Sequence, residues 1–272
     1  MYQNLDALDG KQARKLGLAS PLGQLFDHGC DCCSSTLYFL NIACILKLGR
    51  SPFLFMFYMF CLNMIFYSSN WAEFFTHILR TNSNNVGVTE IHMMMIALNF
   101  LVAIFTDEIF QFTVFGYGFC SVFVFAIVIV MIVNMTPLMS EAWEKASDKK
   151  LFLKMLIPIL SYVVVLFFAY FVKNSMFDKP NLTMALIFNL PFNILTIKII
   201  TASLTRMNYE LVHLEIVGLF ALVVLYSVVP SYFLCFVFAA LIMTRLVTMA
   251  FGIIKDISGY LKINILLVPK NK

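Results

Sequence analysis

Four aspartates in the first 31 residues have the spacing of two helical faces. Asp6 and Asp9 are three residues apart, and Asp27 and Asp31 are four apart, so each pair would lie on one face of a helix. Small residues continue the same two faces, at Gly10, Ala13 and Gly23. If two such helices pack side by side, the four carboxylates converge and the small residues leave room beside them.

A convergence of carboxylates predicts a site for divalent cations. Four like charges at the head of a membrane segment are unfavourable unless cations neutralise them. Carboxylate oxygens favour Mg²⁺, Mn²⁺ or Ca²⁺, and two divalent ions would balance four aspartates. Because paired metal ions clamp both oxygens of a phosphoryl displacement, we expect phosphoryl transfer chemistry. The alternative is that these residues are ordinary charges on a solvated segment at the membrane surface.

His28 is the candidate general base. It directly follows Asp27 and can therefore reach the rim of the same site. An imidazole is suited to proton abstraction near neutral pH, whereas an aspartate bound to a metal is a poor base. The alternative is an ordinary solvated histidine.

The rest of the chain consists of apolar segments long enough to cross a membrane. Hydrophobic residues make up 61% of the 272 residues and charged residues only 12%. A hydrocarbon core needs about 20 apolar residues per helix. We therefore predict an all-α polytopic membrane protein, a single domain over residues 1–272. About eight transmembrane helices are expected, at 21–47, 52–70, 88–106, 113–135, 151–172, 182–204, 212–229 and 231–254.

The first aspartate pair is predicted to lie on the cytosolic side. Residues 1–16 have the composition of the end of a helix, and a break follows with Ser20 as N-cap and Pro21 at the first helical position. An even number of spans puts both termini on one side, where the loops and termini hold thirteen Lys and Arg residues against four opposite. By the positive-inside rule that side is cytosolic. No basic tract or aromatic platform is present, so we expect no nucleic acid partner.

The complete motif resembles the signature of the CDP-alcohol phosphotransferases. Every fixed position of that signature is matched by Asp6-x2-Asp9-Gly10-x2-Ala13-Arg14-x8-Gly23-x3-Asp27-x3-Asp31. The segments "DGKQAR", "SPLG" and "LFDHGCD" look like the eukaryotic choline/ethanolaminephosphotransferase branch, and "NW" at Asn70–Trp71 and "VTE" at Val88–Glu90 are similar to it as well. The likeness extends over most of the chain, and the first motif carries its specificity.

The resemblance implies an enzyme with defined substrates. Phosphocholine or phosphoethanolamine would pass from its CDP-alcohol to diacylglycerol, with CMP as the second product. Either His28 or Asp31 would take the proton of the diacylglycerol hydroxyl. Two Mg²⁺ or Mn²⁺ ions would be held by Asp6, Asp9, Asp27 and Asp31. The CDP pocket would be lined by Gly10, Ala13, Arg14 and Gly23, with Gln24 as a further contact. The family also implies a membrane protein of the endoplasmic reticulum or Golgi, typically a homodimer, with its site facing the cytosol.

Lys198 is a further candidate for binding the donor. It stands in an otherwise apolar stretch about two turns from the predicted cytosolic end of its span. Its long side chain could contact a phosphate of the CDP-alcohol, or it could simply reach to the membrane surface.

Two features depart from the family. The choline/ethanolamine branch commonly has Glu where this chain has Gln24, four residues before His28. An amide can orient an imidazole but cannot stabilise its positive charge. Members of the family also carry about two transmembrane helices before the motif, so we expect the chain to be N-terminally incomplete.

Three alternatives remain open. A phosphatidyltransferase that joins CDP-diacylglycerol to a soluble alcohol such as inositol shares the motif, although "LFDHGCD" favours the first reaction. A shortened, inactive isoform could bind lipid or a partner protein. An ion transporter would place acidic residues at mid-membrane on several spans, whereas here they gather at one end.

Overall fold

The computed structural model describes residues 2–79, 88–172 and 182–262. Of residues 2–7, 9, 88–92, 94 and 107–108, only the backbone is described. The elements are α1 (Tyr2–Lys15), α2 (Pro21–Ile45), α3 (Pro52–Thr76), α4 (Val88–Phe105), α5 (Phe119–Lys145), α6 (Lys149–Lys154), α7 (Ile157–Phe171), α8 (Leu182–Thr205), α9 (Leu214–Val228) and α10 (Tyr232–Leu261). Short 3-10 turns cover Leu48–Arg50 and Asp107–Phe110, and β1 (Thr113–Val114) pairs antiparallel with β2 (Tyr117–Gly118).

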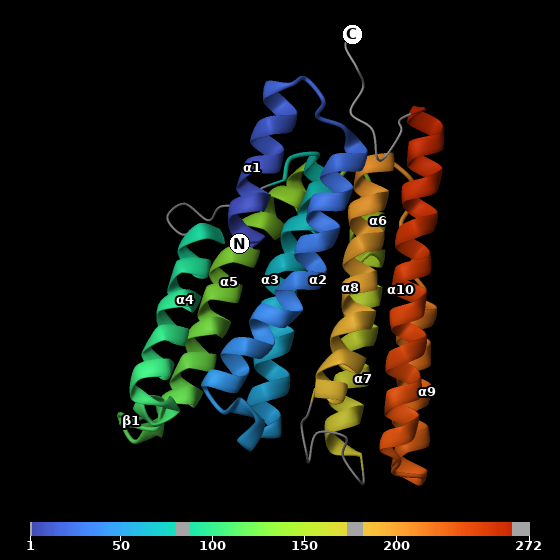
Figure 1. Ribbon diagram of the computed structural model, residues 1–272. Helices are drawn as coiled ribbons and strands as arrows, with labels where there is room; N and C mark the ends of the chain where they lie inside the picture. Colours follow the sequence, from blue (N-terminus) through green and yellow to red (C-terminus); the bar gives the residue numbers. More distant parts are fainter. Residues whose placement is uncertain (1, 80–87, 173–181, 263–272) are drawn as a thin grey trace.

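The predicted all-α membrane architecture is confirmed. Within the described residues, five helices are long and apolar enough to cross a membrane, namely α3, α5, the α6–α7 pair, α8 and α10. Helices also lie at the other three predicted ranges, as α2, α4 and α9. The long helices run side by side along one direction (Figure 1). The chain is therefore an integral membrane protein, while the count of eight spans stays a prediction.

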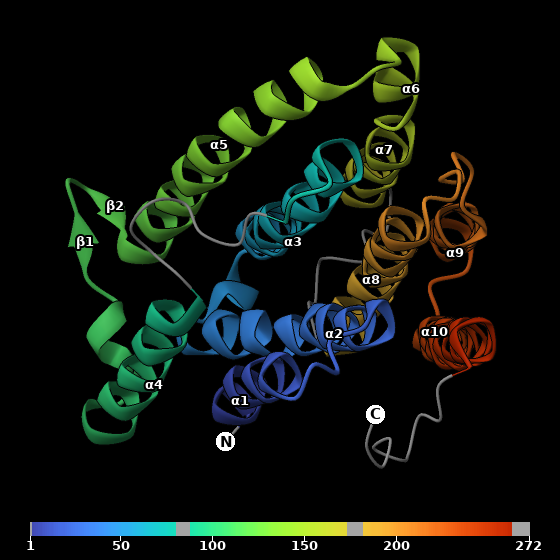
Figure 2. The same cartoon turned by 90° about the horizontal axis from the view of Figure 1, so that it is seen from above.

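The start of α2 follows the sequence prediction. Ser20 is the N-cap, and its side-chain oxygen accepts a hydrogen bond from the backbone N–H of Gly23 at 3.1 Å. Pro21 occupies the first helical position, where its missing N–H costs nothing. This turn reverses the chain, so that α1 and α2 lie antiparallel and side by side (Figures 1 and 2).

The predicted span at 113–135 is wrong at both ends. Residues 113–118 form the β1–β2 hairpin, because Phe115 and Gly116 adopt positive φ angles of 50° and 82° that a helix does not allow. The helix that follows continues through Pro137 to Lys145. Two side chains bond the carbonyls of the preceding turn, Asn134 to Val130 and Thr136 to Ile132, each at 2.7 Å. Neither bond reaches the carbonyl of Val133, which is the one that Pro137 leaves without a backbone N–H donor.

Three other predicted spans have different limits. The helix predicted at 52–70 continues as α3 to Thr76. The range 151–172 is divided into α6 and α7 just before Pro158, since proline cannot donate the hydrogen bond that would continue the first helix. The last helix extends to Leu261 rather than ending near 254.

Helix α8 lies at the centre of the bundle. It contacts α2, α3, α9 and α10, and Figure 2 shows it between these neighbours. Most of its residues are buried, including the polar side chains of Asn189, Asn193 and Thr196. The buried cluster around α8 extends to α3, α5 and α6, where the Trp71 ring meets Phe152 edge-on, with centroids 4.7 Å apart.

Replacing Trp71 by alanine should destabilise the bundle strongly. Its side chain is 2% exposed and fills the space between α3 and α6, so its loss leaves a cavity that costs about 3–5 kcal/mol. The measurement is the temperature at which half of the detergent-solubilised protein is lost from its size-exclusion peak. Trp143→Ala is the matched control, because Trp143 touches the same Phe152 ring but is 42% exposed. Equal shifts for the two variants would contradict the packing described for Trp71.

Candidate active site

Helices α1 and α2 place the motif residues on two adjacent helices. Gly10 and Ala13 lie on α1, and Gly23, Asp27 and Asp31 lie on α2. Asp6 and Asp9 are also within α1, but their side chains lie outside the described part of the structure. The predicted side-by-side arrangement of two helices is therefore present, and the convergence of all four carboxylates stays a prediction.

The residues present fit a divalent cation site by their chemistry. Asp27 and Asp31 are half-buried residues one turn apart on α2, and the helix α2 itself lies beside α1 (Figure 2). Carboxylate oxygens are the ligands that Mg²⁺ and Mn²⁺ prefer. Among the described side chains no group of three or more His, Cys, Asp or Glu could hold a metal ion. A complete site at α2 would therefore need the aspartates of α1.

Small residues of the motif keep space open next to charged and polar groups. A methyl group added at Gly10 would stand 3.4 Å from a guanidinium nitrogen of Arg14, so the Arg14 side chain lies over Gly10. One added at Gly23 would stand 3.5 Å from the Ser20 hydroxyl. The exposed Arg14 guanidinium is a suitable partner for a phosphate, because its N–H groups bond phosphate oxygens in pairs.

Gln24 contacts a buried carboxylate that the sequence reading did not single out. Its Nε2 amide donates to Oε1 of Glu73, on α3, at 3.3 Å. The Glu73 side chain is buried, with 6% exposure. A signal was present in the sequence, since Glu73 directly follows a stretch of α3 that lacks charge. The partner of Glu73 could not be known without the pairing of α2 with α3.

Contacts between α2 and α8 show which residues stand at the level of the motif. The Asn193 amide donates to the Thr36 hydroxyl at 3.1 Å, and the Cys32 thiol donates to the Asn193 carbonyl at 3.7 Å. The two helices run in opposite directions (Figure 1). Equal rise per residue then puts Lys198, five residues beyond Asn193, at about the height of His28.

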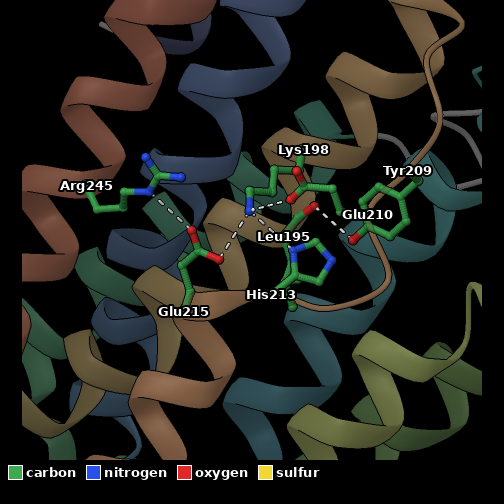
Figure 3. Close-up of polar contacts among 7 residues, drawn as sticks. All are labelled: Leu195, Lys198, Tyr209, Glu210, His213, Glu215 and Arg245. Atoms are coloured by element: carbon green, nitrogen blue, oxygen red, sulfur yellow. Dashed lines mark hydrogen bonds and ion pairs between the residues drawn. The ribbon is translucent and has the colours of Figure 1, made fainter.

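Lys198 is the centre of an ionic cluster, shown in Figure 3. Its Nζ atom lies 3.2 Å from Oε2 of Glu210 and 3.2 Å from Oε2 of Glu215. The second oxygen of Glu215 lies 3.4 Å from Nε of Arg245 on α10. Two cations and two carboxylates balance, so the cluster ties α8, α9 and α10 together without excess charge.

The ion pairs of Lys198 bear on its two predicted roles, a contact with a phosphate and a side chain that reaches to the membrane surface. The Lys198 side chain is 17% exposed and pairs with one buried and one exposed carboxylate. Glu210, whose side chain is 69% exposed, is the partner that a phosphate oxygen could replace. A contact between Lys198 and the donor therefore stays a prediction.

His213 completes the cluster and was not singled out as a buried residue from the sequence. Its ring lies in the loop before α9, is 2% exposed, and its Nδ1 atom is 3.5 Å from the ammonium of Lys198. Burial lowers the pKa of His213, and the positive charge of Lys198 lowers this pKa further, against the opposite effects of Glu215 and Glu210. The imidazole is consequently neutral near pH 7.

Comparison with known proteins identifies relatives for part of the chain. It is 41% identical to cholinephosphotransferase 1 of Gallus gallus over 98 residues, which are 36% of this chain and 29% of that protein. It is 37% identical to cholinephosphotransferase 1 of Homo sapiens over 114 residues, 42% of this chain and 28% of that protein. The CDP-alcohol phosphatidyltransferase class-I family protein 2 of Dictyostelium discoideum is 37% identical over 112 residues, 41% of this chain and 26% of that protein.

These matches confirm the family resemblance for about two fifths of the chain. The relatives are named cholinephosphotransferases and a CDP-alcohol phosphatidyltransferase class-I family protein, which are transferases. The chain spans less than a third of the length of these relatives. No protein-family model matches it.

Removing the charge of Glu215 should destabilise the bundle. Glu215→Gln leaves Lys198 and Arg245 without their shared carboxylate, and breaking such a buried pair costs about 3 kcal/mol. Thermal unfolding of the protein in detergent, followed by size-exclusion chromatography, measures the loss. Glu141→Gln is the control, since Glu141 pairs with Lys145 in a half-exposed i,i+4 contact worth about 0.5 kcal/mol. A loss no greater than the control's would overturn the assignment of the cluster as a helix clamp.

Acidification should weaken the same region through His213. A pKa below the unfolded value of about 6.5 means that the unfolded chain binds the proton more readily. The stability contributed by neutral His213 is therefore present above about pH 6.5 and is lost as the pH falls through its folded pKa. Unfolding temperatures at about pH 7.5 and about pH 5.5 should differ less in His213→Gln than in the unmodified protein. An identical pH dependence of the two proteins would refute this role.

Proposed function

We propose that this protein transfers phosphocholine or phosphoethanolamine from the CDP-alcohol to diacylglycerol, releasing CMP. The single observation that carries the proposal is the eight-position motif divided between the adjacent helices α1 and α2, with Asp27 and Asp31 on one face of α2. The likeness to cholinephosphotransferases over 36–42% of the chain supports it.

The reaction assigns a role to each group of the motif. The diacylglycerol hydroxyl attacks the β-phosphorus, the bond from that phosphorus to the bridging oxygen breaks, and CMP leaves. His28 accepts the hydroxyl proton, which raises the nucleophilicity of the oxygen at the moment of attack. Arg14 binds phosphate oxygens, while Gly10, Ala13 and Gly23 let the diphosphate approach the helices closely.

The aspartates would hold the metal ions. Asp27 and Asp31 on α2, with Asp6 and Asp9 on α1, would bind two Mg²⁺ or Mn²⁺ ions. Such ions, when bound, neutralise the negative charge of a diphosphate and of its leaving group.

The membrane position suits one water-soluble and one lipid substrate. The motif lies at one end of the helical bundle, where a CDP-alcohol can arrive from water and diacylglycerol can arrive laterally within the bilayer (Figure 1). The distribution of positive charge supports the cytosol as the side of the site. We propose a membrane of the endoplasmic reticulum or Golgi as the location and a homodimer as the assembly.

A direct assay tests the reaction. The chain is purified in nanodiscs and incubated with Mg²⁺, diacylglycerol and labelled CDP-choline or CDP-ethanolamine, and CMP release is measured. We expect release that depends on both Mg²⁺ and diacylglycerol. Release only from CDP-diacylglycerol with inositol would instead identify a phosphatidyltransferase. No release from any mixture would refute enzymatic activity for this chain and favour a lipid- or partner-binding role.

Asp27→Ala should lower the rate of CMP release by at least about a hundredfold, because a metal ligand is lost from the site. Asp148→Ala is the matched control: Asp148 caps α6 by accepting from the N–H of Lys150 and lies outside the motif. Rates are compared at equal amounts of monodisperse protein. A near-normal rate for Asp27→Ala would show that the metal assignment is wrong.

A further inference from the structure

Glu73 is a buried carboxylate for which the described residues supply no cation. Its Oε1 atom accepts one hydrogen bond, from the amide of Gln24, and its Oε2 atom is buried without a hydrogen-bond partner among the described residues. Burying a carboxylate is costly unless opposite charge or several donors compensate it. Glu215, equally buried, has two cations within 3.4 Å. The contrast indicates that Glu73 is retained for something other than packing.

The bond to Glu73 fixes the orientation of the Gln24 amide. An amide has one donor side and one acceptor side, so an NH₂ group held by Glu73 directs the carbonyl oxygen away from α3. Gln24 and His28 are four residues apart on α2 and share one helical face. The carbonyl of Gln24 is thereby on the same face as the imidazole.

We propose that Glu73 is a positioning residue, which holds the Gln24 amide so that its carbonyl accepts a hydrogen bond from one imidazole N–H of His28. The other ring nitrogen is then the acceptor for the substrate's hydroxyl proton. The carboxylate that orients the amide stands on α3, at Glu73, rather than at residue 24 itself. This inference rests on the proposed function, because it assigns His28 as the base of that reaction.

The arrangement also accounts for the glutamine at position 24. A glutamate at this position would face the carboxylate of Glu73 at hydrogen-bond distance, and two like charges would repel in a half-buried setting. With Glu73 present, the amide is the compatible partner. The two positions should therefore behave as an exchangeable pair.

Reciprocal exchange tests the proposal by kinetics. Glu73→Gln should lower kcat by about tenfold, with a KM for the CDP-alcohol changed by less than about threefold, since a general base contributes to the chemical step. The double variant Q24E/E73Q returns the carboxylate to α2 and should recover kcat to within about threefold of the unmodified protein. Glu144→Gln, an exposed Glu on α5, is the matched control and should leave both constants unchanged. No loss in Glu73→Gln, or no recovery in the double variant while it remains folded, would overturn the proposal.

A spectroscopic measurement keeps this test separate from the test of the reaction. Nitrogen-15 shifts of the histidine rings are recorded in nanodiscs, with the His28 signals identified by their loss in His28→Gln. We expect one neutral tautomer in the unmodified protein, a mixture in Glu73→Gln, and one tautomer again in Q24E/E73Q. Identical spectra would refute the positioning role even if CMP is released. Conversely, these shifts together with an absence of CMP release would refute the proposed function alone.

Discussion

The buried polar side chains of α8 are the constraint on which the arrangement of the other helices depends. Asn189 accepts a hydrogen bond from Asn63 on α3, Asn193 donates to Thr36 on α2, and Lys198 pairs with a carboxylate at the start of α9. Each bond joins α8 to a different neighbour, at a different height. In an apolar bundle, sliding one helix by a turn would leave such a group without a partner and cost a few kcal/mol. These three residues therefore fix the register of the bundle where hydrophobic packing alone would allow several.

That register brings charge to a common level at one end of the molecule. The contacts of Asn193 with Cys32 and Thr36 place Lys198 at the height of residues 27–31 of α2, the turn that holds His28. The bond from Gln24 places Glu73, on α3, near the same end of α2. The motif on α1 and α2 thus does not stand alone at the membrane surface. An ionic cluster of α8, α9 and α10 lies on one side of the motif, and the buried carboxylate of Glu73 on α3, the α-helix that follows α2, lies on the other.

Local signals predicted local structure well. Ser20 and Pro21 predict the start of α2, because an N-cap hydrogen bond and the fixed φ of proline act within one helical turn. The long apolar segments predict the membrane helices. The hairpin at 113–118 was missed because its turn depends on two positive φ angles inside an apolar segment. The predicted end at residue 135 was wrong because the helix continues through Pro137 to Lys145, which the apolar pattern alone did not reveal. Glu73 and His213 gained importance only through helix pairing, which one sequence does not reveal. The aspartate motif could be recognised because both of its helices are consecutive in the chain.

The two buried glutamates show how a site can be distinguished from a structural clamp. The negative charge of Glu215 is compensated by Lys198 and Arg245, so its burial is explained without a ligand. Glu73 has one neutral donor and a second oxygen without a partner among the described residues. Folded proteins accept such local imbalance mainly where function needs it, and the rest of the fold carries the cost. Because Gln24 connects the unbalanced carboxylate to the face of α2 that holds His28, the imbalance lies next to the chemistry that the motif predicts. The uncompensated carboxylate of Glu73 and the aspartate motif therefore lie at the same end of α2.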